Sequence, residues 1–152
     1  MKDGFVKAAV STPELRVADC LFNEKKIKEK AEKLAEKGAR LIVFPEFALT
    51  GYTCQDLFLQ DTLLDGATEA LKQLAVDTAG IKAVVVVGLP LEMQGRLYNV
   101  AAVLNQGKIL GFVPKSHMPN YGEFYEARQF APWKGENTTY RFQDGTEVPF
   151  GT

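Results

Sequence analysis

The chain has 152 residues, of which 46% are hydrophobic and 24% charged, with a net charge of −1. This length and composition are typical of one soluble globular domain. The near-zero net charge argues against a nucleic-acid partner and against attraction to an anionic membrane, and no apolar run approaches the roughly 20 residues of a membrane-spanning helix.

The first half of the chain alternates between extended and helical patterns. Residues 5–10 form a short apolar run that predicts a strand. Residues 23–38 predict an amphipathic helix, because apolar residues from Ile27 to Ala35 recur at helical spacing among lysines and glutamates. Asn23 is the expected N-cap of that helix. The run that follows, residues 40–44, is almost wholly apolar and predicts a strand buried on both faces.

The second half adds one helix and several strands. The expected elements are a helix over residues 65–78, a strand over 83–88, a hairpin over 97–113 that turns at 105–107, and a last hairpin around Asp144 and Gly145. The resulting β-α-β-α-β-β order predicts an α/β layered fold with helices packed on a sheet.

Glu46 is the first candidate for chemistry, because it stands directly after the apolar strand in "LIVFPEFALTGYTCQDLF", residues 41–58. Sheets of α/β proteins place their ligands outside the carboxyl ends of strands. Partial desolvation there suits a carboxylate to proton transfer. The alternative is a glutamate that caps a turn or pairs with a surface lysine.

A second cluster of candidates lies in "FVPKSHMPNYGEFYEARQF", residues 112–130. Lys115 also follows an expected strand, where an ammonium group can stabilise an oxyanion that forms on a substrate carbonyl. Glu123 stands eight residues later among aromatic side chains, including Tyr121, that are typical of a small-molecule pocket or of a core rim. His117 is the only histidine, and since a metal site needs more ligands, we expect none.

The two segments together resemble the early signatures of the carbon–nitrogen hydrolase (nitrilase) superfamily. The resemblance implies an α-β-β-α sandwich of which this chain holds the N-terminal part, so that residues 1–152 are part of one hydrolase domain. It also implies that Glu46 is a general base, that Lys115 stabilises the tetrahedral intermediate, and that Glu123 is a further glutamate beside them.

Within the superfamily, "LTGYTCQDLFLQ", "KSHMPNYGEFYEARQF" and the terminal "VPFGT" are most similar to the glutaminase domain of glutamine-dependent NAD synthetases. This likeness implies that Tyr121 lines a glutamine pocket and that Tyr52 stands near its entrance. It further implies a synthetase domain in the same chain, which uses ATP and Mg²⁺ to amidate deamido-NAD, and a homo-oligomer. The glutaminase part itself is expected to need no cofactor.

The nucleophile of this superfamily is a cysteine in a third motif, which is expected downstream of Thr152. Cys54 lies inside the first motif and Cys20 precedes the first helix, so we expect both to be buried, inert thiols. Two cysteines are too few for a disulfide framework, and we therefore expect a cytoplasmic protein. The 152-residue chain by itself is predicted to be inactive.

Two other functions compete with the glutaminase hypothesis. One is a stand-alone amidase or nitrilase of the same superfamily that acts on another amide or nitrile. The other is a non-catalytic α/β module that binds a partner or a small molecule and shares only the scaffold.

Overall fold

The computed structural model of this protein describes residues 4–152. Its strands are β1 (Ala8–Val10), β2 (Leu41–Val43), β3 (Val84–Met93), β4 (Arg96–Asn105), β5 (Lys108–Pro114), β6 (Thr138–Arg141) and β7 (Glu147–Phe150). Its helices are α1 (Cys20–Glu36) and α2 (Asp61–Asp77), and two short 3₁₀ turns are η1 (Gln55–Leu59) and η2 (Glu126–Arg128). These elements confirm the predicted α/β class.

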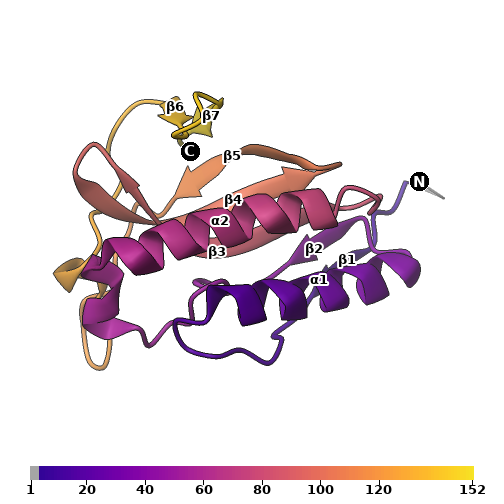
Figure 1. Cartoon of the computed structure of the whole chain (residues 1–152), viewed down its shortest axis with the longest axis horizontal. Helices are drawn as coiled ribbons and strands as arrows, with labels where there is room; N and C mark the ends of the chain where they lie inside the picture. Colours follow the sequence, from indigo (N-terminus) through magenta and orange to yellow (C-terminus); the bar gives the residue numbers. More distant parts are fainter. Residues whose placement is uncertain (1–3) are drawn as a thin grey trace.

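The strands form one sheet in the order β1-β2-β3-β4-β5-β7-β6. Strands β1, β2 and β3 are parallel, whereas β4 is antiparallel to both β3 and β5. Strands β2, β3 and β5 therefore run in the same direction, and their carboxyl ends lie at one edge of the sheet. The hairpin of β6 and β7 carries the C-terminus at the top of Figure 1.

Helices α1 and α2 lie side by side on one face of the sheet (Figure 1). Because side chains alternate along a strand, every second residue faces these helices. Ile42, Val85 and Val87 face them and are at most 1% exposed. The residues that alternate with them along β2 and β3 are half-buried. They line the other side of the sheet, which we call the open face.

Helix α1 begins three residues earlier than predicted, and the prediction of Asn23 as its N-cap is wrong. The carboxylate of Asp19 accepts the backbone N–H of Phe22 at 3.1 Å and is the N-cap. Asn23 is buried instead, and its amide donates to the carbonyl oxygens of Arg16 and Leu49 at 2.8 and 3.0 Å. Both residue types cap helices well, but Asn23 is needed to join the loop before α1 to the turn after β2.

Three other boundaries differ from the prediction. Strand β1 is shorter than residues 5–10, α2 starts at Asp61 rather than at residue 65, and β3 runs five residues beyond Gly88. Strand β3 can include Pro90 because its partner β2 ends opposite Val86, so the missing N–H of the proline has no neighbour to bond on that side. The predicted hairpin turns at residues 105–107 and near Gly145 are confirmed.

Candidate active site

Glu46 is presented by a tight turn that follows β2. The next residue, Phe47, has a φ of 51°, a left-handed conformation that is uncommon for a residue with a large side chain. Its ring is 1% exposed and packs against Phe58 and Phe130, with centroid distances of 4.9 Å to each. The buried ring thus anchors the turn and leaves the neighbouring carboxylate, which is 47% exposed, at the surface.

The same turn packs directly against Gly88 of β3. A Cβ atom on Gly88 would lie 2.6 Å from the carbonyl oxygen of Pro45, 2.6 Å from the nitrogen of Phe47 and 2.7 Å from the Cα of Glu46. These atoms belong to the backbone and cannot rotate away. Only glycine therefore lets the turn sit this close to the strand.

Lys115 directly follows β5, and its backbone is held on both sides. Its N–H donates to the carbonyl oxygen of Asn99 at 2.8 Å, and its own carbonyl accepts the N–H of Trp133 at 3.0 Å. The Nζ atom lies 3.0 Å from Oε1 and 3.1 Å from Oε2 of Glu46. The structure thus brings together two residues that the sequence placed at the ends of separate strands.

The second carboxylate at Lys115 is Glu126, which was not among the residues predicted from the sequence. Both of its oxygens lie 3.1 Å from Nζ of Lys115, and its side chain is 6% exposed. Glu123 is exposed and, among the described residues, makes no ion pair within 4.0 Å with Lys115. Gly122, with a φ of +58°, makes a turn just before Glu123, and η2 begins three residues after Glu123, at Glu126.

Two polar side chains complete the group. The hydroxyl of Tyr52 donates to Oε1 of Glu126 at 2.8 Å. The amide of Asn99, on β4 and 3% exposed, donates to Oε2 of Glu46 at 3.0 Å and makes a longer contact of 3.5 Å with Oε2 of Glu126. We call Glu46, Tyr52, Asn99, Lys115 and Glu126 the strand-end cluster.

The charges of this cluster keep the lysine cationic. Burial on its own lowers the pKa of Lys115, but the hydrogen bonds and charges of Glu46 and Glu126 outweigh it, and the net effect raises that pKa. Burial and the bond to Glu126 also raise the pKa of Tyr52, so its hydroxyl stays a donor. The cluster can therefore offer one carboxylate as a base and one permanent positive charge.

The aromatic residues of the second segment lie around the cluster to different extents. Tyr121 is 72% exposed and packs edge-on against Phe124, with a centroid distance of 5.7 Å. A cavity of about 30 Å³ lies next to the cluster and is lined by residues that include Tyr52, Glu123 and Glu126. Tyr52 is thus tied directly to the cluster, whereas Tyr121 stands out from it on an exposed loop.

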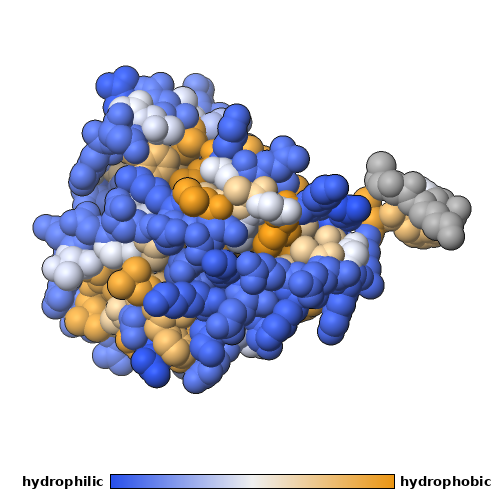
Figure 2. Space-filling model, turned by 45° about the vertical axis from the view of Figure 1, so that its right-hand side comes forward, coloured by the Kyte–Doolittle hydropathy of each residue, from blue (hydrophilic) through white to orange (hydrophobic). Residues whose placement is uncertain are grey.

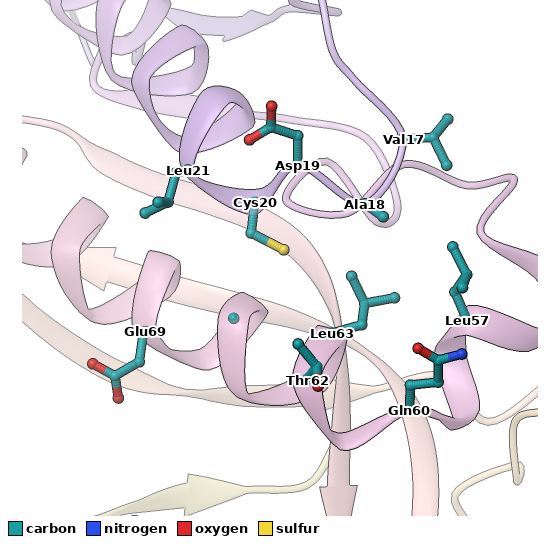
Figure 3. A pocket seen from close by; sticks show the side chains of 11 residues that line it. Val17, Ala18, Asp19, Cys20, Leu21, Leu57, Gln60, Thr62, Leu63 and Glu69 are labelled. Atoms are coloured by element: carbon teal, nitrogen blue, oxygen red, sulfur yellow. The ribbon is translucent and has the colours of Figure 1, made fainter.

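A separate groove of about 600 Å³ lies in the helix layer, between the starts of α1 and α2. Figure 3 shows Cys20 pointing from the first turn of α1 toward α2. Burial, with smaller effects from Cys54 and Asp19, raises the pKa of Cys20 to about 11. Burial also raises the pKa of Cys54, whose Sγ lies 3.1 Å from the carbonyl oxygen of Thr50. Both thiols are therefore protonated near neutral pH and are poor nucleophiles.

Residues 4–152 contain no cluster of three or more histidine, cysteine, aspartate or glutamate side chains placed to hold a metal ion. In the same part of the chain, every helix is too short or too polar to cross a membrane.

The turn after β2 carries a glutamate that faces a lysine at the end of β5. Residues 7–151 match the family described as carbon-nitrogen hydrolase, and the chain belongs to this family. It is 44% identical over 149 residues to the glutamine-dependent NAD(+) synthetase of Mycobacterium tuberculosis, a match that covers 98% of this chain and 22% of that protein. The corresponding protein of Aquifex aeolicus is 37% identical over 134 residues, which cover 88% of this chain and 23% of the relative.

Solved structures agree with the assignment. The glutamine-dependent NAD(+) synthetase of Cytophaga hutchinsonii superposes with a TM-score of 0.89 at 28% identity, over 96% of this chain and 25% of that one. An amidase from Nesterenkonia sp. superposes with a TM-score of 0.72 at 22% identity, over 98% of this chain and 56% of that one, which shows the shared fold. The chain thus spans about a fifth of the length of the curated relatives that it matches.

Proposed function

We propose that this chain supplies the base and the stabilising cation of a glutaminase site, which releases ammonia for the amidation of deamido-NAD. The observation that carries the proposal is the 3.0 Å contact between Nζ of Lys115 and Oε1 of Glu46. The similarity to glutamine-dependent NAD(+) synthetases supports glutamine as the substrate. A synthetase domain in the same polypeptide receives the ammonia in this proposal.

The two carboxylates of the cluster are suited to different roles. Each oxygen of Glu126 has two donors, because Lys115 contacts both oxygens while Tyr52 and Asn99 add one donor each. Oε1 of Glu46 has only the lysine, and this side chain is the more exposed one. A base needs a free lone pair and access to the substrate, so Glu46 is the base and Glu126 is the buried anchor of Lys115.

The reaction then follows from these roles. Glu46 takes the thiol proton of a cysteine that lies outside residues 1–152, and the sulfur forms a bond to the side-chain carbonyl carbon of glutamine. The ammonium of Lys115 stabilises the negative charge on the carbonyl oxygen. The C–N bond breaks as Glu46 returns the proton to the leaving nitrogen. Glu46 then deprotonates a water molecule whose oxygen bonds to the thioester carbon. The C–S bond breaks, glutamate is released, and the cysteine sulfur takes back the proton from Glu46.

The ATP and Mg²⁺ of the synthesis step belong to the synthetase domain in this proposal. Residues 4–152 lack a cluster of metal ligands, and the cation of the cluster is already held by two carboxylates. The proposal also includes a cytoplasmic location, which the two free, buried cysteines support, and assembly of the complete protein as a homo-oligomer.

The proposal is tested by placing this chain in the Mycobacterium tuberculosis relative, in exchange for the matching 149 residues. We expect the chimera to make NAD with glutamine or with free ammonia. Glu46→Gln and Lys115→Ala should each reduce the glutamine-dependent rate by about 1,000-fold or more and leave the ammonia-dependent rate unchanged. Glu29→Gln is the matched control, since this carboxylate belongs to α1, outside the cluster and its cavity, and its side chain is 55% exposed.

Near-normal glutamine-dependent rates in either cluster variant would show that the roles are assigned wrongly. A chimera that hydrolyses other amides but not glutamine would favour the stand-alone amidase hypothesis. The 152-residue chain alone should be inert toward amides, and an acyl adduct on Cys54 in its mass spectrum would contradict the proposal.

A further inference from the structure

Asn99 connects every charged member of the strand-end cluster. Its carbonyl oxygen accepts the backbone N–H of Lys115 at 2.8 Å. Its side-chain nitrogen lies 3.0 Å from Oε2 of Glu46 and 3.5 Å from Oε2 of Glu126. Its position on β4, opposite Pro90 of β3, keeps this side chain 3% exposed. In the described part of the chain, no other residue is hydrogen-bonded to all three charged residues.

The donor count shows what this amide contributes. An ammonium group has three N–H donors, but Nζ of Lys115 lies within 3.1 Å of four carboxylate oxygens. An amide nitrogen has two N–H donors, one for each carboxylate that Asn99 contacts. Asn99 thus shares the task of stabilising both carboxylates, and because it is neutral, it leaves the charge of the cluster unchanged.

The same contacts make the two oxygens of Glu46 different. Oε2 accepts from both Asn99 and Lys115, whereas Oε1 accepts from Lys115 alone. With Oε2 held from two directions, the carboxylate cannot rotate about its terminal bond without losing a hydrogen bond. Oε1 is therefore the oxygen that remains available for a reacting group.

We propose that Asn99 is a positioning residue, whose amide orients the base Glu46 through Oε2 and relieves Lys115 of part of its bonding to the two carboxylates. The ammonium can then turn one N–H toward the carbonyl oxygen of the substrate. This inference rests on the proposed function for its catalytic consequence, but the amide contact itself is independent of any reaction.

The contact is tested by NMR on the 152-residue chain. As pH falls and the carboxylates take up protons, the side-chain N–H signals of Asn99 should shift, because their acceptors lose charge. Asn105 is the matched control, since it lies on the same strand and its amide donates to the carbonyl oxygen of Ala83 at 3.0 Å, an acceptor that does not titrate. Asn99 signals that stay as constant as those of Asn105 would overturn the inference.

The catalytic consequence is tested in the chimera described above. Asn99→Ala should lower kcat for glutamine by about 100-fold with little change in KM, because a misplaced base slows chemistry more than binding. Asn99→Asp keeps the shape but replaces the donor by an acceptor. Its kcat should be at least as low, and its pH optimum should move to lower pH, where a protonated Asp can donate again.

The outcomes separate this inference from the proposed function. If Asn99→Asp matches the parent chimera in rate and pH profile, Asn99 only fills space and the inference is wrong. If the parent chimera has no glutamine-dependent activity, the proposed function fails, while the NMR titration still decides the contact. The control Asn105→Ala should leave both the rate and the pH profile unchanged.

Discussion

Two regions of this protein each bury a glutamate, and they treat it in opposite ways. At the strand-end cluster, Glu126 is 6% exposed and both its oxygens accept hydrogen bonds. In the helix layer, Glu24 of α1 is 2% exposed and its Oε1 has no partner. Lys28, one turn further along the helix, lies 3.1 Å from Asp77 instead.

Burial by itself therefore does not mark a functional carboxylate. Burial raises the pKa of Glu24, and the nearby charge of Asp77 raises it further against the smaller opposing effects of Lys28 and Lys25. The helix layer thus favours the neutral form of its glutamate. The strand-end cluster instead surrounds Glu126 with an ammonium, a phenol and an amide, all of which are donors to a charged carboxylate.

The largest effect on stability is expected when Glu126, the glutamate with more hydrogen-bond donors, is removed. Glu126→Ala leaves Lys115 with one carboxylate and Tyr52 without its acceptor. We expect a loss of about 3 kcal/mol in the free energy of unfolding, measured by urea denaturation of the chain. The control Glu123→Ala removes an exposed carboxylate and should change that free energy by less than about 0.5 kcal/mol. Equal effects at the two positions would abolish the distinction between them.

Each of the two regions also contains a glycine, and alanine at the two positions should have opposite effects on stability. Gly88→Ala forces a methyl group against the backbone of Pro45 and Phe47, and we expect a loss of about 2 kcal/mol together with NMR shifts around Glu46. Gly66→Ala on α2 places its methyl group 3.8 Å from Sγ of Cys20, an ordinary contact. Because alanine favours helix, that variant should gain up to about 1 kcal/mol. A tolerated Gly88→Ala would mean that the turn can move away from β3.

The smallest effect on stability is expected at Glu24, the buried glutamate with an unpartnered oxygen. Glu24→Gln should stabilise the chain by about 1 kcal/mol at neutral pH, because it removes a buried charge that lacks a partner. The raised pKa means that protonated Glu24 stabilises the fold below pH 4.5, the ordinary value, and that this contribution is lost as pH rises through the raised pKa.

The direction of this pH dependence is checked by measuring the free energy of unfolding between pH 4 and pH 8. The parent chain should lose stability relative to Glu24→Gln as pH rises over this range. The control Glu29→Gln, on the same helix with a side chain that is 55% exposed, should follow the parent chain. A Glu24→Gln variant that is less stable than the parent at pH 7 would show that the carboxylate has a partner in solution.

The sequence was sufficient for the parts of the site that follow strands. Glu46 and Lys115 stand directly after apolar runs, and strand direction alone brings such positions to one edge of a sheet. The α/β class was predictable for the same reason, since helical and extended periodicities alternate clearly along the chain. The C-terminal boundary of β3 was harder to predict, because a proline such as Pro90 normally indicates the end of a strand. It is tolerated here only because β2 is short and ends before Pro90.

The other residues of the site are held by contacts that leave no periodic pattern in the sequence. Glu126 lies in an irregular segment, where only the turn at Gly122 indicates that Glu123 is exposed. Asn99 did carry a recognisable feature, because it is a polar residue inside the apolar run "LYNVAAVL". A buried amide must find hydrogen-bond partners, and this requirement could have pointed to it.

The open face of the sheet exposes a band of valine side chains to water. Val10, Val43, Val86 and Val103 are paired in register across four strands and stay partly exposed to water, and Val10 alone is 82% exposed. On the side of the molecule that it draws, Figure 2 shows other apolar patches that interrupt a largely hydrophilic surface. Such a band gains free energy whenever molecules associate through it, so folding and self-association become linked by mass action. We therefore expect the unfolding midpoint of the 152-residue chain to rise with its concentration.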